Sequence, residues 1–342
     1  MSSNGFWTDR RVFVTGCTGI VGSWLTLALL TRGADVVGLI RDRVPNSGLF
    51  RSGAAARITH VDGDIVDFPL LERTLNEYEI DTAFHLAAQP LVRVANRMPV
   101  GTFETNVRGT WLLLEACRHV KTITRVVVAS SDKAYGDQDV LPYSEDAPLQ
   151  GRHPYDVSKA CADLIARAYA YTYEMPIAVT RCGNIYGGGD LNWDRIVPGT
   201  MRSVLGGEPP IIRSDGSPLR DYLYVDDIVD GYLRLAEGLD DRSLHGQAFN
   251  FGMDDPKSAL EIVESIIAIS GYPGLKPLIL NHASHEIQNQ YLSSEKARRL
   301  LGWQPRYTLV QGLRSTLEWY RAYLSETEGS SKMPGILQTS SV

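Results

Sequence analysis

The chain has 342 residues, of which 44% are hydrophobic, enough for one large or two ordinary domains with a full core. Its net charge of -6 argues against non-specific nucleic-acid binding, and no run of about 18 apolar residues is present that could cross a membrane. The four cysteines are scattered without metal-ligand or disulfide spacing, so we expect a cytoplasmic protein without a bound metal.

Strands and helices alternate along the first half of the chain. Short apolar strands are predicted at Arg11–Thr15, Val36–Ile40, Ile58–Asp62, Thr82–Leu86, Arg125–Ala129 and Ile177–Arg181. Helices are predicted between them at Ser23–Thr31, Leu70–Tyr78, Thr102–His119 and Tyr155–Tyr173. This alternation predicts an α/β fold, a doubly wound parallel sheet with helices on both faces.

Beyond about Gly183 the alternation stops. Residues 187–198 and 206–218 are rich in Gly, Asp and Pro and are predicted as loops, and long loops of this kind usually surround a ligand. Helical patterns return at Asp226–Glu237, Ala259–Ser270, Ser294–Leu301 and Leu309–Leu324. The polar stretch 325–342 is predicted to be disordered.

Three glycines, Gly16, Gly19 and Gly22, follow the first strand and open the first helix. Glycines at this spacing permit a tight turn, close approach of the backbone to a pyrophosphate and close helix packing, and the helix N-terminus offers N–H groups to the anion. The segment therefore predicts a dinucleotide site, with Thr18 and Ile20 as further contacts in the same turn.

The identity of the dinucleotide depends on residues after the second strand. Asp42 could bind a ribose 2′-hydroxyl, as NAD requires, whereas Arg43 with its neighbour Arg41 could pair with the 2′-phosphate of NADP. We favour NAD over NADP. Asp64 would suit the adenine amino group, or it could be a solvated loop residue. The remaining candidate cofactor contacts are Ile65, Leu86, Ala87 and Ala88.

Tyr155 and Lys159 lie one helical turn apart. A phenol alone is a poor base at neutral pH, since its reference pKa is about 10. A lysine ammonium four residues on shares the same helix face and stabilises the phenolate, which makes the tyrosine a usable proton acceptor beside a hydride acceptor. Ser131 follows the strand Arg125–Ala129, where it could hydrogen-bond a substrate hydroxyl and share its proton with Tyr155.

Several motifs resemble those of extended short-chain dehydrogenases/reductases, in particular the nucleotide-sugar epimerase/dehydratase branch. They are TGCTGIVG at Thr15–Gly22, HLAAQ at His85–Gln89 and YDVSK at Tyr155–Lys159, and the resemblance covers residues 6–323. It implies a Rossmann NAD-binding domain over 1–183, to which 221–255 returns in part, and a smaller mixed domain over 184–324 that mainly binds substrate. It also implies tightly held NAD, a nucleotide-sugar substrate, a structural role for Asn106 and a homodimer built on helices such as 102–119 and 155–173.

Asp132 and Lys133, which follow Ser131, bear on the reaction that follows oxidation at sugar C4. Ser-Asp-Lys resembles the triplet of CDP-glucose 4,6-dehydratases, in which the two residues after the Ser or Thr are the acid and base that eliminate water across C5–C6. Four further stretches resemble the same enzymes: GSWL at 22–25, AAQPLVR at 87–93, GGGD at 187–190 and DRIVP at 194–198.

Other stretches resemble 4-epimerases instead. After Lys133 the chain reads AYGDQDVLPYSEDAPLQ and lacks the tryptophan-rich insertion of CDP-glucose dehydratases, and RDYLYVDD at Arg220–Asp227 resembles the diphosphate-binding stretch of 4-epimerases. Lys133 and Arg195 would then form a cationic pocket for a C5 carboxylate, with Asp132 orienting Lys133. The balance favours a 4-epimerase of an NDP-hexose or NDP-hexuronate, such as UDP-glucuronate to UDP-galacturonate. The alternative is an NDP-glucose 4,6-dehydratase.

The resemblance also implies substrate contacts. Asn184 matches a family position that touches the substrate diphosphate, and Arg220 is expected to pair with a phosphate oxygen. Arg213 is a further candidate, although a solvated loop side chain would fit equally well. The remaining candidates are Gln89, Arg93 and Arg195.

Overall fold

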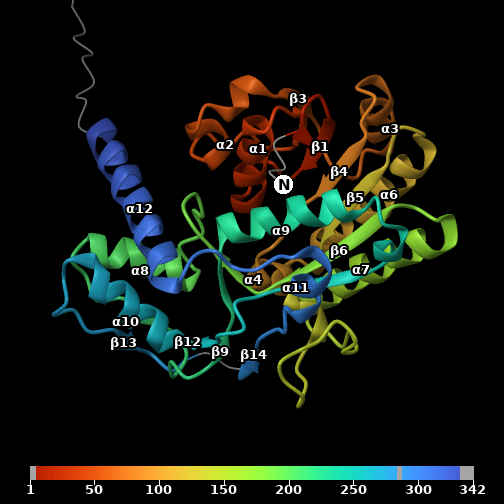
Figure 1. Cartoon of the computed structure of the whole chain (residues 1–342). Coiled ribbons are helices and arrows are strands. Elements are labelled where there is room, and N and C mark those ends of the chain that lie inside the picture. The colour runs from red at the N-terminus through yellow and green to blue at the C-terminus, as the bar shows by residue number, and fades with distance from the viewer. Residues whose placement is uncertain (1–4, 283–286, 332–342) are drawn as a thin grey trace, which may run out of the picture.

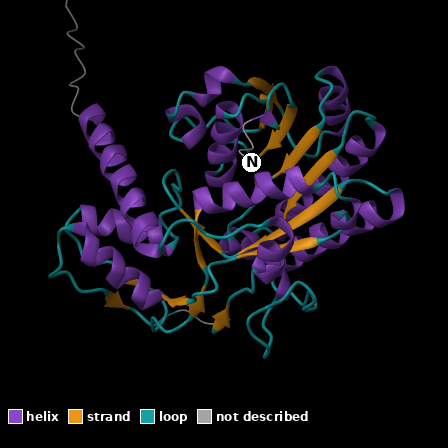
Figure 2. Ribbon diagram, in the orientation of Figure 1, coloured by secondary structure: helices purple, strands orange, loops and turns teal. Residues whose placement is uncertain are grey.

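A seven-stranded parallel sheet forms the centre of the computed structural model, which describes residues 5–282 and 287–331 (Figures 1 and 2). Its order is β11-β6-β5-β4-β1-β2-β3, so the predicted doubly wound parallel sheet is confirmed. The order reverses between β1 and β4, and sheets of this kind bind ligands at that point, beyond the carboxyl ends of the strands. The strands are β1 (Arg11–Thr15), β2 (Asp35–Ile40), β3 (Thr59–Asp62), β4 (Thr82–His85), β5 (Arg125–Ala129), β6 (Ile177–Cys182) and β11 (Ala248–Phe251).

Successive residues of the central strands enter two different cores, because their side chains alternate between the faces of the sheet. Val12 and Val14 pack in the core that includes α1 (Ile20–Thr31) and α9 (Val225–Gly238). Phe13 packs in the other, which includes three helices: α3 (Phe68–Glu77), α6 (Gly109–His119) and α7 (Pro154–Tyr173). Figure 1 shows α9 crossing in front of the sheet. Burial on both faces explains why these strands are continuously apolar in sequence.

All four helices predicted in the first half of the chain begin earlier than expected, and for α3 and α7 the difference is only one or two residues. α1 starts at Ile20, because Gly19 takes the extended conformation of the residue before a helix. The helix predicted over 102–119 begins at Pro99 and is divided into α5 (Pro99–Phe103), a π-helical turn (Glu104–Arg108) and α6. Shorter elements that were not predicted are α2 (Gly48–Arg51), α4 (Val92–Arg97) and the 3₁₀ turns Ala54–Arg57, Asp132–Tyr135 and Arg242–Leu244.

Most of the remaining elements form a smaller, mixed layer beside the carboxyl edge of the sheet, with α8, α10 and α12 packed on one another. The helices of this C-terminal layer are α8 (Ile196–Leu205), α10 (Ala259–Ser270) and α12 (Leu309–Ser331). α11 (Glu295–Leu301) packs instead on α9 and on the edge strand β11 of the central sheet. The strands of the layer pair as β7 (Asn184–Tyr186) with β10 (Tyr222–Tyr224), β8 (Ile211–Ile212) with β13 (Leu278–Ile279), and β9 (Leu219–Arg220) between β12 (Lys257–Ser258) and β14 (Asn289–Gln290).

Three predictions for this part need correction. The predicted loop 206–218 contains β8, which pairs with β13. Residues 196–198 were assigned to a loop but begin α8, where Pro198 is tolerated because first-turn N–H groups have no helical partner. α12 continues to Ser331 rather than ending at Leu324, and the rest of the predicted disordered stretch, 332–342, lies outside the described residues. No helix within the described ranges is long and apolar enough to cross a membrane.

Candidate active site

A cavity of about 1320 Å³ opens beyond the carboxyl ends of β1, β4, β5 and β6 and is lined by both parts of the molecule. A site for one drug-sized ligand usually measures roughly 300–1,000 Å³. The cavity therefore has room for two ligands side by side, as a reaction between a cofactor and a substrate requires.

The glycine turn forms one end of the cavity and has no space for a side chain at Gly16 or Gly22. Gly16 has φ +72°, and a Cβ there would lie 2.7 Å from the backbone nitrogen of Ala87. A Cβ on Gly22 would lie 2.1 Å from the carbonyl oxygen of Gly16. α1 has no side-chain cap and no acidic residue in its first turn, so its N–H groups face no competing anion. These residues fit the pyrophosphate of a dinucleotide.

Nearly all the other candidate cofactor contacts also line the cavity: Thr18, Gly19, Ile20, Asp42, Asp64, Ile65, Leu86, Ala87 and Ala88. Asp42 pairs with Arg41 at 2.7 Å, and both line the wall. Arg43 is the exception, and its contact with the cofactor stays a prediction. Its guanidinium turns to Asp62 at 3.0 Å, because that carboxylate ends the neighbouring strand β3, and Arg43 is not among the lining residues.

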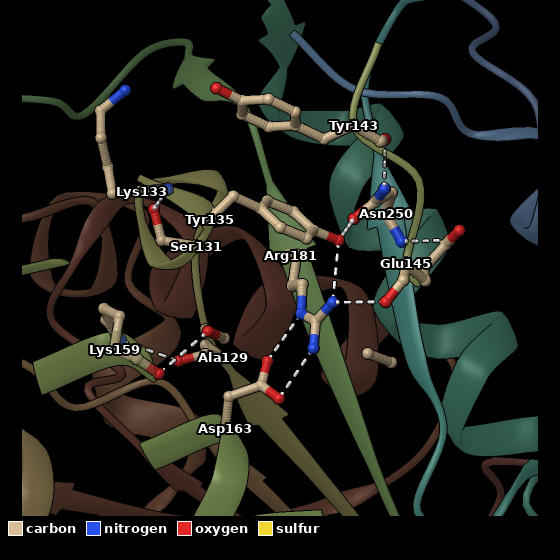
Figure 3. Close-up of polar contacts among 12 residues, drawn as sticks. Ala129, Ser131, Lys133, Tyr135, Tyr143, Glu145, Lys159, Asp163, Arg181 and Asn250 are labelled. Atoms are coloured by element: carbon tan, nitrogen blue, oxygen red, sulfur yellow. Dashed lines mark hydrogen bonds and ion pairs between the residues drawn. The ribbon is translucent and has the colours of Figure 1, made fainter. Parts of the chain in front are cut away.

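Tyr155 and Lys159 both reach the cavity from the buried face of α7. Burial raises the pKa of Tyr155 to about 12, against the opposing effects of a hydrogen bond with Ser131 and the charge of Arg195. Burial likewise lowers the pKa of Lys159 to about 8. The Nζ of Lys159 donates to the carbonyl oxygen of Ala129 at 2.7 Å (Figure 3), and its role in stabilising the phenolate stays a prediction.

Ser131, Asp132 and Lys133 form a tight turn at the end of β5. The hydroxyl of Ser131 accepts from the N–H of Lys133 at 3.2 Å and donates to Oδ1 of Asp132 at 3.0 Å. Asp132 is 2% exposed, and its Oδ2 lies 3.5 Å from Nζ of Lys133. Burial lowers the pKa of Lys133, and Asp132 opposes that change. An acid and an amine therefore meet at the cavity beside Tyr155.

A buried ion pair supports this turn from behind, and no sequence motif indicated it. Arg181 and Asp163 are both fully buried and joined by two hydrogen bonds of 2.7 and 2.9 Å. Arg181 also donates to the hydroxyl of Tyr135 at 2.8 Å, and that hydroxyl donates to Asn250 at 2.7 Å. Figure 3 shows Lys133 extending away from this network. The sequence did contain one signal of this pair: Arg181 is a charged residue at the end of the predicted apolar strand Ile177–Arg181.

All six candidate substrate contacts line the cavity: Gln89, Arg93, Asn184, Arg195, Arg213 and Arg220. Three of the four arginines in this set pair with two aspartates, Asp190 and Asp194, to which the sequence had given no role. Arg195 pairs with Asp190 at 2.9 Å, while Arg93 and Arg213 share Asp194 at 3.3 and 2.7 Å.

Three further side chains make hydrogen bonds that fix the part of the cavity wall carrying the candidate substrate contacts. Arg220 donates to the carbonyl oxygens of Leu219 and Gln288 at 2.8 and 3.0 Å. Asn106 is buried and hydrogen-bonded to both backbone groups of Gln89, which agrees with its expected structural role. Gln290 lies outside every motif, yet its amide reaches Asp132 and Lys133.

Fold and site together define an enzyme of the nucleotide-sugar epimerase/dehydratase branch of the short-chain dehydrogenases/reductases. Residues 13–316 match the model of one family, described as GDP-mannose 4,6 dehydratase. The chain belongs to this family.

The proteins to which this chain is similar include both 4,6-dehydratases and 4-epimerases. CDP-glucose 4,6-dehydratase of Salmonella typhimurium is 35% identical over 95% of this chain and 94% of its own length. The dTDP-glucose 4,6-dehydratase DesIV of Streptomyces venezuelae, with NAD and TYD bound, has a TM-score of 0.81 at 28% identity, covering 92% of this chain and 98% of its own. A mutant UDP-glucuronic acid 4-epimerase of Bacillus cereus, with UDP-4-deoxy-4-fluoro-glucuronic acid and NAD, scores 0.82 at 26% identity, covering 92% and 99%.

Proposed function

We propose that this protein is an NAD-dependent 4,6-dehydratase of an NDP-glucose, with CDP-glucose as the first substrate to test. The observation that carries the proposal is the contact of Asp132 with Lys133 beside Tyr155, an acid and an amine at the same wall of the cavity. The 35% identity to a CDP-glucose 4,6-dehydratase supports the same choice. We therefore prefer the dehydratase to the 4-epimerase that the sequence patterns favoured.

The proposed steps assign the proton transfers to Tyr155, Lys133 and Asp132. Bound NAD supplies the hydride acceptor for oxidation at C4 and the donor for the final reduction. Tyr155 takes the proton of the C4 hydroxyl, to which Ser131 is hydrogen-bonded. The C4 ketone makes the C5 proton acidic, and Lys133 takes that proton. Asp132 gives a proton to the C6 hydroxyl, which leaves as water and leaves a C5=C6 double bond conjugated with the C4 ketone. The hydride removed from C4 then returns to C6 and Lys133 returns its proton to C5, so that the product is a 4-keto-6-deoxy sugar nucleotide.

A 4-epimerase of a nucleotide-linked uronic acid is the second candidate. Lys133 and Arg195 both line the cavity, as a site for a C5 carboxylate requires, and the fold is close to that of a UDP-glucuronic acid 4-epimerase. Each cation already has a carboxylate partner, however: Asp132 for Lys133 and Asp190 for Arg195. This pairing reduces the positive charge available to a substrate carboxylate, which is why we rank the epimerase second.

The product distinguishes the two reactions. Purified protein is incubated separately with CDP-glucose, dTDP-glucose, UDP-glucose and UDP-glucuronate, and the products are analysed by mass spectrometry and by absorbance in alkali. Loss of one water and the alkaline absorbance of a 4-keto-6-deoxy sugar support the dehydratase. A stereoisomer of unchanged mass would establish the epimerase in its place.

We propose NAD rather than NADP as the resident cofactor, because Asp42 lines the cavity and Arg43 turns away to Asp62. A carboxylate there suits a ribose 2′-hydroxyl and repels a 2′-phosphate. Denaturing the purified protein and identifying the released nucleotide by chromatography tests this assignment. Release of NADP would contradict it.

We also propose a homodimer, since α5, α6 and α7 carry exposed apolar side chains on their outer faces. Val100 is 74%, Trp111 40%, Leu164 54% and Tyr171 91% exposed. α5 and α6 both pack against α7, so these side chains lie on adjoining helices, and exposed apolar patches mark interaction sites. Light scattering should give a dimer mass for the wild type and a monomer mass for Leu164→Glu. An unchanged mass in the variant would place the interface elsewhere.

A further inference from the structure

Gln290 is a buried amide whose two ends both contact the turn that carries the proposed acid and base. Its side chain is 0% exposed. Nε2 donates to the carbonyl oxygen of Asp132 at 3.1 Å, and Oε1 accepts from Nζ of Lys133. A buried amide is destabilising unless both ends are hydrogen-bonded, and here the turn supplies both partners. The partners also fix the orientation of the amide, because exchanging its nitrogen and oxygen would set donor against donor and acceptor against acceptor.

The backbone around Gln290 is held in place on both sides. β14 pairs with β9, which sets Gln290 opposite Arg220. Two residues further on, the N–H of Leu292 donates to the carboxylate of the buried Asp221 at 2.6 Å. The amide therefore approaches Lys133 from a defined backbone position. The contact depends on the packing of the C-terminal layer against the end of β5.

The charges that act on the amine of Lys133 come from three elements. Asp132 belongs to the same turn, Asp156 lies on α7, and Arg220 lies on β9. Burial lowers the pKa of the amine, whereas the two carboxylates raise it. Gln290 is uncharged, so it accepts an N–H from the amine without adding a negative charge that would favour the ammonium.

We propose that Gln290 is a positioning residue for dehydration: it holds the amine of Lys133 at the cavity wall while leaving that amine free to act as a base. The proposal rests on the proposed function. A neutral amine has two N–H groups and one lone pair. Binding one N–H to Oε1 of Gln290 fixes the side chain, and the lone pair stays available for the C5 proton. A glutamate at position 290 would hold the amine equally well but would keep it protonated.

Three variants distinguish the positioning of the Lys133 amine from the effect of a charge at residue 290. Gln290→Glu retains the acceptor and adds a charge, and Gln290→Met retains the length but removes both polar ends. Gln288→Glu is the matched control, because it makes the same chemical change at an exposed side chain whose amide donates to Ser217 at 2.8 Å. Each variant is purified with its cofactor, and circular dichroism and thermal melting establish that it folds.

The first measurement determines the charge state of Lys133 without turnover. Competitive acetylation by acetic anhydride across a pH series, followed by mass spectrometry of the Lys133 peptide, gives the pKa of the amine. Gln290→Glu should raise this pKa by about 1 pH unit or more, as a nearby opposite charge does. Gln288→Glu should leave it at the wild-type value.

The second measurement is kcat against pH, with CDP-glucose as the probe. The rate of a lysine base rises as pH passes its pKa, so the rising limb should move upward in Gln290→Glu by the same amount as in the labelling, and kcat at neutral pH should fall about tenfold. Gln290→Met should lower kcat by roughly tenfold or more without an upward movement of the limb.

The outcomes distinguish this proposal from the proposed function. An unchanged Lys133 pKa in Gln290→Glu, or a wild-type kcat in folded Gln290→Met, overturns the role of Gln290 even if the protein is a dehydratase. If no sugar nucleotide yields a 4-keto-6-deoxy product but Gln290→Glu still raises the pKa, the proposed function fails and the control of Lys133 by Gln290 stands.

Discussion

Asp221 offers a sharp test of how burial sets protonation near the site. Its side chain is 1% exposed, and its two oxygens accept from the N–H groups of Leu292 and Met253 at 2.6 and 3.2 Å. Burial raises its pKa from 3.8 to about 7, against the effect of these hydrogen bonds. Asparagine has nearly the same shape but does not ionise, so Asp221→Asn removes the titration and retains the packing.

The expected effect follows from the protons bound by the folded and unfolded wild type. Below about pH 4 both states carry the proton, so ionisation does not affect stability. Between about pH 4 and about pH 7 the unfolded chain loses the proton while the folded protein keeps it, so the free energy of unfolding falls as pH rises. Above about pH 7 the loss is complete and amounts to about 4 kcal/mol. The variant lacks this loss at every pH.

Urea unfolding followed by tryptophan fluorescence measures the difference. Between about pH 4.5 and about pH 8.5 the stability of Asp221→Asn relative to wild type should rise by about 3 kcal/mol. Equal m values for the two proteins ensure that the same transition is compared. A stability difference that stays constant across this range would refute the raised pKa, and with it the dominance of burial over the two backbone hydrogen bonds.

Three further predictions concern the turn and its support. Tyr155→Phe should lower kcat by about 10²–10⁴-fold while the released cofactor per chain stays unchanged, and a fully active variant would remove Tyr155 from the proposed mechanism. Lys133→Met should abolish 4-keto-6-deoxy product while single-turnover absorbance still shows reduced nicotinamide, whereas dehydration at the wild-type rate would exclude Lys133 as the base. Arg181→Met leaves the carboxylate of Asp163 unpaired in the core and should lower the free energy of unfolding by about 3–5 kcal/mol in urea, a loss that an unchanged melting temperature would contradict.

Strong local patterns made the sheet predictable from the sequence. β1, β5 and α10 have the predicted bounds, because continuous apolar runs and a regular helical period define them. α8 was missed because Pro198 and the neighbouring glycines and aspartates look like a loop, although proline in a first helical turn is harmless. β14 has only two residues, too few for any period, and it owes its conformation to pairing with β9.

The contrast between local sequence patterns and distant contacts also applies to the residues of the site. Residues in motifs, such as Tyr155, Lys159 and Gly16, were located because their chemistry requires fixed local spacing. The contact of Arg43 with Asp62 could not be predicted, since it depends on the position of β3 and not on the residues around Arg43. Gln290 could not be found, because it meets Lys133 only through contacts between residues 157 positions apart.

These distant contacts bear on how the proposed acid and base are assembled. The backbone of β5 and the cap of Ser131 place Asp132 and Lys133 at the cavity, and the buried pair of Arg181 and Asp163 supports the turn through Tyr135. The amine of Lys133 takes its partner Gln290 from the C-terminal layer. If the Rossmann half alone bound cofactor and oxidised C4, it would still lack the contact that holds the base. Under the proposed function, dehydration would therefore require the packed C-terminal layer, whereas the residues proposed to hold the cofactor and to act at C4 belong to the first half of the chain.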